Sequence, residues 1–375
     1  MKKILFVALL ATLLAASCQK TEIINPVGNK IGFSTGMNKL TKAADADSSG
    51  TFNLQEQNFR VWAYGAYEDP NTEKIEKNHV YDGIENLAVT YAGGWGTVKE
   101  YYWPGVGKDL MFFAVSADQT FLGTSGTTST NVSVTHGATI ADATMTVQNF
   151  TVNSDSPNED LMVADFVQQN QNDKVVDLHF HHALSKVEFV FKTLKSNDTT
   201  KVAPQVFVQS LVVDSLATKG TLNVCKDTSA ASVPVDTTGG KYAATVVPVE
   251  FKWEVDSTDV SKKSFKDDWK ASVTYIEGTD TTAVRDTTAM QLTVKPQTFS
   301  TWLMLPQNIE GKKVAITYVI NKRQFTSIFA LDKNDLKEWT DNQHIKYTVT
   351  LAPNVISFNP IVNDWANPTD REYQN

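Results

Sequence analysis

Residues 345–351 read IKYTVTL, and this stretch shows the pattern that decides the fold. Its apolar residues Ile345, Tyr347, Val349 and Leu351 alternate with polar Lys and Thr residues. A repeat of two places alternate side chains on opposite faces of an extended chain, so one face can be buried and the other solvated. The segment is therefore predicted to be a half-buried β-strand.

The same alternation recurs throughout the chain. It is found in Phe59–Tyr64, Val176–Phe180 and Val187–Phe191, and a short apolar run covers Leu110–Val115. Clusters of Thr, Ser, Gly, Asn and Asp separate these segments, as turns require. One short helix is expected at Asp332–Trp339. Short strands with few helices favour an all-β protein built of sandwiches over a parallel α/β sheet.

The N-terminus has the features of an export signal. Lys2 and Lys3 precede an apolar run of 11 residues, Ile4–Leu14, and small residues lead to Cys18. A membrane-spanning helix needs roughly 20 residues, so the run indicates a cleavable signal peptide at residues 1–17. The small residues before Cys18 resemble a lipobox, in which this thiol is acylated. The other cysteine, Cys225, then has no internal disulfide partner.

The charge balance excludes one class of partner. The chain has 34 Lys and Arg against 42 Asp and Glu, a net charge of −8. Removal of Lys2 and Lys3 with the signal peptide leaves 32 − 42 = −10. An acidic chain without a basic cluster is a poor nucleic-acid binder, and we expect no nucleic-acid partner. Any membrane contact is expected through the lipid on Cys18.

The length of the mature chain is enough for two cores. Residues 168–173, QQNQND, are expected to be too polar to enter a core, so the predicted boundary falls there. The two predicted domains are residues 18–170, with an extended N-terminal arm, and residues 171–375. The arm before Phe59 is poor in apolar residues except at Ile31–Phe33.

Several segments in order resemble the fimbrillin family, the subunits and anchors of surface fimbriae in Gram-negative anaerobes. They span residues 31 to 365, nearly the whole mature chain. Tyr102, Trp103 and Pro104 belong to one of them, and we expect the two aromatic residues to anchor the core. The segments are YYWP at 101–104 with LMFFA at 110–114, DLMVA at 160–164 with VDLHFHHALSKV at 176–187, KGTL at 219–222, LPQ at 305–307, and ISF at 356–358 with VNDW at 362–365.

The resemblance implies two tandem transthyretin-like β-sandwich domains and assembly by donor-strand exchange. In that process a protease removes the N-terminal strand, and an extended segment of another subunit fills the exposed groove. The implied function is a structural or adhesive subunit of surface fimbriae, lipid-anchored at the outer membrane, with other fimbrial subunits as partners. A host protein or a glycan is a possible ligand.

The processing site is expected near Lys42. Subunits of this family are cleaved after a basic residue, but the arm has no Arg before Arg60, which lies in a predicted strand. Lys39 and Lys42 remain, and Lys42-Ala43 is preferred because a polar, acidic loop follows it. Cleavage there would release Ile31–Phe33. The predicted donor strand covers residues 355–362, with Val355, Ile356, Phe358, Ile361 and Val362 as its apolar side chains.

Two motifs have a composition that suits metal ions. His179 and His181 would share a strand face, but His182 would not and no cysteine is nearby, so a structural role is favoured. Asp45, Asp47, Ser49, Gly50 and Glu56 match the spacing of a calcium loop, but the flanking helices are missing, which favours a flexible acidic loop. No metal and no cofactor are expected.

Asp-Ser/Thr triplets occur at Asp198, Asp214, Asp236, Asp280 and Asp286. They fit either O-glycosylation acceptors or ordinary turn chemistry, and both interpretations stay open.

No motif of a known catalytic class is present, and the chain is predicted not to be an enzyme. Three alternatives remain: a surface lipoprotein that binds carbohydrate or a host ligand without polymerising, a fimbrial anchor, and a hydrolase with convergent carboxylates.

Overall fold

The computed structural model describes fourteen ranges of the 375-residue chain. They are 29–35, 58–65, 80–105, 108–152, 160–170, 175–194, 205–213, 216–230, 233–235, 244–256, 265–267, 290–320, 323–353 and 355–364.

A nine-stranded sheet forms the N-terminal part of the molecule, with the main strand order β15-β16-β9-β5-β2-β3-β4 and with β8 and β11 joined to β5. Its strands are β2 (Phe59–Gly65), β3 (Leu87–Tyr91), β4 (Trp95–Gly96), β5 (Leu110–Ser116), β8 (Met162–Ala164), β9 (Phe166–Gln169), β11 (Phe180–His182), β15 (Val233–Val235) and β16 (Ala244–Val247).

Both faces of this sheet are buried, which explains why β2 and β5 are mainly apolar, with Arg60 and Ser116 as buried polar residues. Phe59 and Val61 of β2 belong to one apolar core, and Trp62 and Tyr64 belong to another on the opposite face. We call the first the outer core. It is covered by the short parallel pair β1 (Phe33–Thr35) and β10 (Val176–Leu178).

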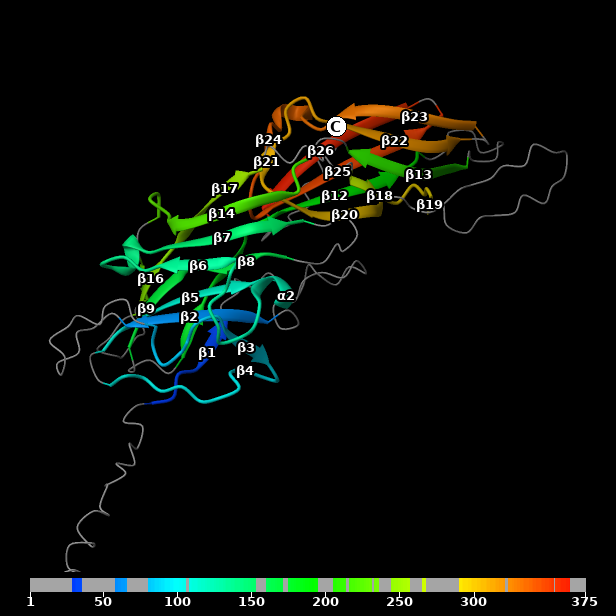
Figure 1. Ribbon diagram of the computed structural model, residues 1–375. Coiled ribbons are helices and arrows are strands. Elements are labelled where there is room, and N and C mark those ends of the chain that lie inside the picture. Colours follow the sequence, from blue (N-terminus) through cyan, green and yellow to red (C-terminus); the bar gives the residue numbers. More distant parts are fainter. Residues whose placement is uncertain are drawn as a thin grey trace, which may run out of the picture.

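A four-stranded sheet lies beside the other face, in the order β17-β14-β7-β6. Its strands are β6 (Val132–Thr135), β7 (Thr144–Thr151), β14 (Lys219–Lys226) and β17 (Val249–Val255). Met145, Val147, Leu222 and Val224 of this sheet share a core with Trp62 of β2. Figure 1 shows this sheet between the N-terminal strands and the C-terminal strands.

The C-terminal part is a pair of sheets that face each other. One has the order β20-β12-β25-β26; in the other, β18 and β19 both pair with β13, and β22 and β23 follow. The strands are β12 (Ser185–Lys192), β13 (Val206–Val213), β18 (Phe265–Asp267), β19 (Met290–Gln291), β20 (Gln297–Met304), β22 (Lys313–Ile320), β23 (Arg323–Ala330), β25 (Gln343–Ala352) and β26 (Val355–Asp364). Two short strands, β21 (Gln307–Asn308) and β24 (Glu338–Trp339), form a separate two-stranded sheet.

The regular secondary structure of the described residues is almost entirely β, as the alternation predicts. The exceptions are the four-residue helix α2 (Gln119–Leu122) and two single 3-10 turns, Ile140–Asp142 and Lys333–Asp335. The expected strands within 59–64, 110–115, 187–191 and 345–351 are confirmed as β2, β5, β12 and β25. The one expected within 176–180 is divided at His179 into β10 and the start of β11.

The helix expected at Asp332–Trp339 is wrong. Only the 3-10 turn Lys333–Asp335 forms, and Asn334 and Asp335 take left-handed backbone angles, with φ of 57° and 63°. The chain then extends into β24, which pairs with β21. Tertiary pairing thus overrides the local helical pattern.

The expectation that residues 168–173 cannot enter a core is wrong for Gln169. This side chain is buried in β9, and its Nε2 donates to the carbonyl oxygen of Val175 at 2.9 Å. A buried amide is tolerated where its hydrogen bonds are made.

Strands on either side of residue 170 belong to the same sheets. The strand β16 pairs with β9, and β14 pairs with β7, so two strands that follow residue 170 in the sequence pair with strands that precede it. One continuous apolar core also contains residues of both parts of the chain.

Candidate functional site

The first strand is inserted between two other segments of the N-terminal part. On one side, the amide of Ile31 donates to the carbonyl of Tyr101 at 2.8 Å, and the amide of Trp103 donates to Asn29 at 3.0 Å. On the other side, the amide of Val176 in β10 donates to Gly32 at 2.8 Å. Residues 29–35 therefore fill a slot whose two walls each provide backbone hydrogen bonds.

The apolar side chains of this strand close the outer core. Ile31 and Phe33 are buried, and the Phe33 ring makes edge contacts with Phe59 and Phe112, with centroids 6.2 Å apart in both cases. Trp103 packs on Phe112 from the same side. Loss of residues 29–35 would expose these aromatic rings and leave backbone groups on both walls without partners.

Polar contacts fix the end of the first strand. Ser34 Oγ donates to Asp177 of β10 at 2.9 Å, and the indole N–H of Trp95 donates to Thr35 Oγ1 at 3.0 Å. His179 Nε2 also contacts Asp177 at 3.1 Å, and this bond to the carboxylate raises the pKa of His179. Sequence reasoning missed Ser34, Thr35 and Asp177, because no motif links them.

The predicted donor segment forms β26 in its own sandwich. All ten residues of β26 pair with β25, from Val355 opposite Ala352 to Asp364 opposite Gln343. Phe358 is fully buried and stacks between Phe329 of β23 and Tyr347 of β25, each with centroids 5.0 Å apart. Lys333 Nζ lies 5.9 Å and 6.0 Å from the ring centroids of Phe329 and Phe358.

The other predicted donor side chains are exposed to solvent, although they are apolar. These are Val355, Ile356, Ile361 and Val362. Ile356 lies opposite Leu351, a core residue, yet 46% of its surface is exposed. Phe358 and Pro360 are buried between Ile356 and Val362, so the core is exposed only toward the two ends of β26, the last strand of its sheet among the described residues.

The expectation for Tyr102 is corrected by the structure. Tyr101 and Trp103 are buried, whereas Tyr102 is only half-buried and its hydroxyl donates to Glu100 at 2.7 Å. Successive side chains of an extended segment point to opposite sides, so only two of these three aromatic residues reach the core.

Four histidines each contact a carboxylate. His181 contacts Asp165 at 3.0 Å, His182 contacts Asp160 at 2.5 Å and His344 contacts Glu188 at 2.9 Å, in addition to the pair of His179 with Asp177. Such pairs satisfy buried or half-buried side chains. Within the described ranges, no three His, Cys, Asp or Glu side chains are grouped so as to hold a metal ion.

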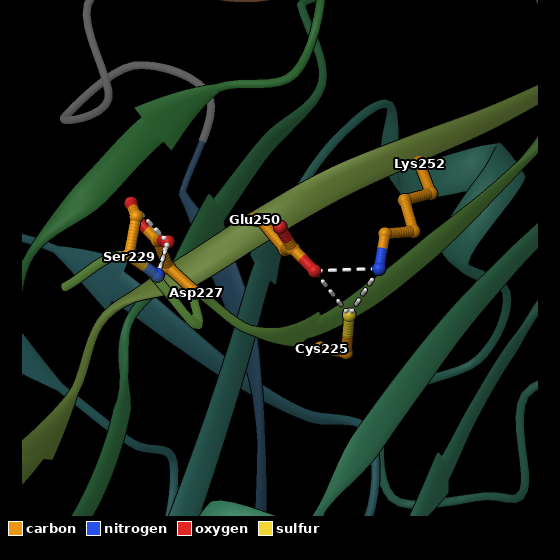
Figure 2. A network of polar contacts seen from close by, with 5 residues as sticks. All are labelled: Cys225, Asp227, Ser229, Glu250 and Lys252. Atoms are coloured by element: carbon orange, nitrogen blue, oxygen red, sulfur yellow. Dashed lines mark hydrogen bonds and ion pairs between the residues drawn. The ribbon is translucent and has the colours of Figure 1, made fainter.

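Cys225 lies in a polar cluster on β14 and β17. Figure 2 shows its thiol together with Glu250 and Lys252, which form an ion pair at 2.5 Å, while Asp227 and Ser229 form a separate bond nearby. Burial and the hydrogen bond to Glu250 raise the pKa of the Cys225 thiol. A thiol that keeps its proton is a poor nucleophile, so the cluster lacks the activation that cysteine catalysis needs.

Several predicted residues lie outside the described ranges. These are Cys18, Lys39, Lys42, Ala43, the acidic loop at 45–56 and the Asp residues of all five Asp-Ser/Thr triplets. Arg60, by contrast, is confirmed within β2, where it is buried and donates to the carbonyl of Gly123 at 2.9 Å. In the part of the chain that the structure describes, no helix has the length and apolar character to cross a membrane.

Comparison with known proteins supports the resemblance. A model of the fimbrillin-like family matches residues 41–365. Similar crystal structures include a fimbrial protein from Bacteroides vulgatus (16% identity, 90% of this chain and 99% of that chain, TM-score 0.44) and a proposed cell adhesion protein from Bacteroides uniformis (14% identity, 90% and 97%, TM-score 0.42). No curated protein matches the chain.

The assignment rests on the family match, because structural similarities at this level of identity and TM-score add no argument about function. The match covers most of the sequence and includes the segments around residues 101–114, 160–187 and 356–365. The chain belongs to the fimbrillin-like family.

Proposed function

We propose that this protein is a structural subunit of a surface fimbria, assembled by donor-strand exchange. Residues 29–35 would leave the slot after cleavage at Lys42-Ala43, and β26 of another subunit would enter it. The main support for the proposal is the position of residues 29–35. This segment is hydrogen-bonded on both sides and covers an aromatic core. An added strand would restore both sets of interactions.

The sequences of the two strands support the exchange. Residues 31–34 read IGFS and residues 356–359 read ISFN, so both present Ile and Phe on one face of an extended chain. In this register Phe358 would take the place of Phe33 against Phe59 and Phe112. Asn359 would take the place of Ser34 and could donate its side-chain amide to Asp177, which now accepts from Ser34.

In the intact chain both positions are filled, since residues 29–35 occupy the slot and β26 is paired along its full length with β25. Strand exchange replaces one set of strand contacts with another. The free energy that favours assembly therefore comes from filling the slot that cleavage has opened. Cleavage is thus the proposed trigger for assembly.

The test is digestion of the purified full-length protein with a Lys-specific protease, with size followed by electrophoresis and sedimentation. We expect polymer ladders after cleavage, loss of ladders on deletion of residues 355–375, and delayed polymerisation for Lys42→Gln. Lys337→Gln, an exposed lysine outside the arm, is the matched control and should polymerise normally. A chain cut at Lys42 that stays monomeric at high concentration contradicts the proposal.

We further propose the finer features that the family resemblance implies. They are a lipid on Cys18 after removal of residues 1–17, location at the outer membrane surface, and two tandem transthyretin-like domains meeting near residue 170. The crossing of the segment from Lys219 to Val255 back to the N-terminal sheets would then be a contact between the domains.

Two alternatives keep their own support. An anchor subunit would retain its first strand, as the intact chain does. A carbohydrate-binding role is supported by Tyr91, an exposed ring that packs against Trp95 across β3 and β4. Trp95, however, packs against Phe59 and donates a hydrogen bond to Thr35, so it also helps to hold residues 29–35 in the slot. Sugar binding that is lost in Tyr91→Ala, without polymerisation, would favour this second role.

A further inference from the structure

Exposed apolar side chains are concentrated at one edge of the C-terminal sandwich. Six of the eleven large ones among the described residues lie on its two neighbouring edge strands, β23 and β26. On β23 they are Phe325, 44% exposed, and Ile328, 66% exposed. Such a concentration marks an interaction surface.

Three edge strands among the described residues carry features that discourage pairing with another chain. The strand β17 carries charged residues, Glu250, Lys252 and Glu254, and β15 and β26 contain Pro234 and Pro360. Charges and prolines are how natural sheets protect their edges. By contrast, residues 324–330 of β23 read QFTSIFA and contain no charge, no proline and no glycine. The edge strands β6 and β20 share this composition, but of these three strands only β23 has large apolar side chains that are exposed.

The hairpin register shows which backbone groups of β23 are available. Ile320 pairs with Arg323 across a two-residue connection, so their N–H and C=O groups bond to each other. The odd-numbered residues of β23 therefore bond to β22, and the even-numbered ones direct their backbone groups outward. Among the described residues, no strand pairs with this outer edge.

We propose that β23 pairs with β23 of a second copy of this chain, antiparallel, about a two-fold axis at Ser327. This register overlaps the full strand and bonds Gln324 to Ala330 and Thr326 to Ile328 of the other copy through their outward backbone groups. It places Phe325 opposite Phe329 of the other copy, twice by symmetry. Aromatic pairs and pairs of β-branched residues are favourable cross-strand neighbours.

A second copy fits this edge better than a charged partner. Residues 324–330 contain no charged side chain that could form an ion pair with such a partner. At each end of the paired strands, Arg323 lies opposite Leu331 of the other copy and next to its Asp332, so opposite charges meet twice. The interface is self-complementary, as a two-fold interface requires. It does not use β26 or the slot, so it is independent of donor-strand exchange.

The register can be tested by cross-linking in the mature full-length chain with Cys225→Ser as background. Ser327 would face itself in a non-hydrogen-bonded pair, with Cα atoms about 4.5 Å apart. That spacing lies within the roughly 4.4–6.8 Å that a disulfide spans. We expect Ser327→Cys to give a covalent dimer under mild oxidation. Val98→Cys, at the most exposed apolar residue (99%), is the control for random collision.

Sedimentation equilibrium of the non-covalent protein provides a second measurement. We expect Ile328→Lys to weaken self-association by about tenfold or more, as a charge inserted at an edge does, and Val98→Lys to leave it unchanged. Ile328 is exposed, so its variant should keep the β-type circular dichroism spectrum. Three results would each overturn the proposal: a monomer at all concentrations, no effect of Ile328→Lys, or Ser327→Cys dimers forming no faster than those of Val98→Cys.

Discussion

Phe33 illustrates what single residues reveal in the sequence and what they do not. The apolar segment at 31–33 stands out in a polar arm, but the strand β1 covers Phe33–Thr35 and shares only Phe33 with it, while Ile31 is held by the hydrogen bond from its amide to Tyr101. Its partners could not be predicted, because Thr35 meets Trp95 60 positions away and Ser34 meets Asp177 143 positions away. Alternation identifies a strand, whereas contacts at such separations depend on the whole fold.

Replacement of Phe33 by Ala should destabilise the protein strongly. Its ring is buried against two other aromatic rings, and large-to-small changes of this kind cost about 3–5 kcal/mol. The measurement is the free energy of unfolding in urea. Val98→Ala, at a fully exposed position, should change it by less than about 0.5 kcal/mol. An equally small effect for Phe33→Ala would show that the first strand is not seated as described.

The lipid is expected on Cys18 alone. Metabolic labelling with a fatty acid in the native host should mark the wild-type protein and fail in Cys18→Ala, because the thiol is the acylated group. Cys225→Ala should keep the label, which controls for expression. Label that persists in Cys18→Ala would refute the lipoprotein prediction.

Strands were predictable wherever apolar and polar residues alternate, as in β12 and β25. The helix expected at 332–339 failed because Asn334 and Asp335 adopt left-handed angles and Trp339 joins a strand pair. Pairing between strands was also hidden: β12 lies parallel to β25, and Glu188 of β12 meets Thr298 of β20 and His344 of β25. Which strands become neighbours is not written in any local pattern.

Glu188 should make stability depend on pH. Its burial favours the protonated form, but hydrogen bonds from His344 and Thr298 outweigh this and lower the pKa of Glu188 below 4.5. A lowered folded-state pKa stabilises the fold above the unfolded pKa, and this contribution is lost as pH falls through the folded value. The free energy of unfolding, measured in urea at pH 7 and at lower pH, should therefore fall less with pH in Glu188→Gln than in the wild type. Glu310→Gln, at an exposed position, should behave like wild type, and identical losses in all three proteins would contradict the prediction.

The fold class and the family of the whole molecule could be predicted from the sequence, but the pairing of its strands could not. An all-β chain of the fimbrillin-like family follows from alternation and ordered motifs. The polar stretch at 168–173 suggested a boundary, yet β14 and β16 return across it to pair with β7 and β9. A polar stretch indicates a possible domain boundary. It does not show which later strands pair with strands that precede the boundary.

Residues 18–170 expressed alone should not fold cooperatively. Without β14 and β16, this fragment lacks the strands that pair with β7 and β9, and it also lacks side chains that complete the shared core. Chemical denaturation followed by tryptophan fluorescence should show no sharp transition, whereas co-expression with residues 171–375 should restore one. A fragment that unfolds sharply by itself would show that the strands returning across residue 170 are not needed for its folding.

The ladder between β25 and β26 has a mechanical consequence. In the chain before any strand exchange, a force applied to the C-terminal segment acts on this ladder. A pull along β26 loads all ten paired positions in shear at once, whereas a sideways pull peels them one by one from Asp364 and Gln343. The first strand has only three such pairs with β10. The direction of the force therefore decides whether the C-terminal segment holds as a unit or is peeled away.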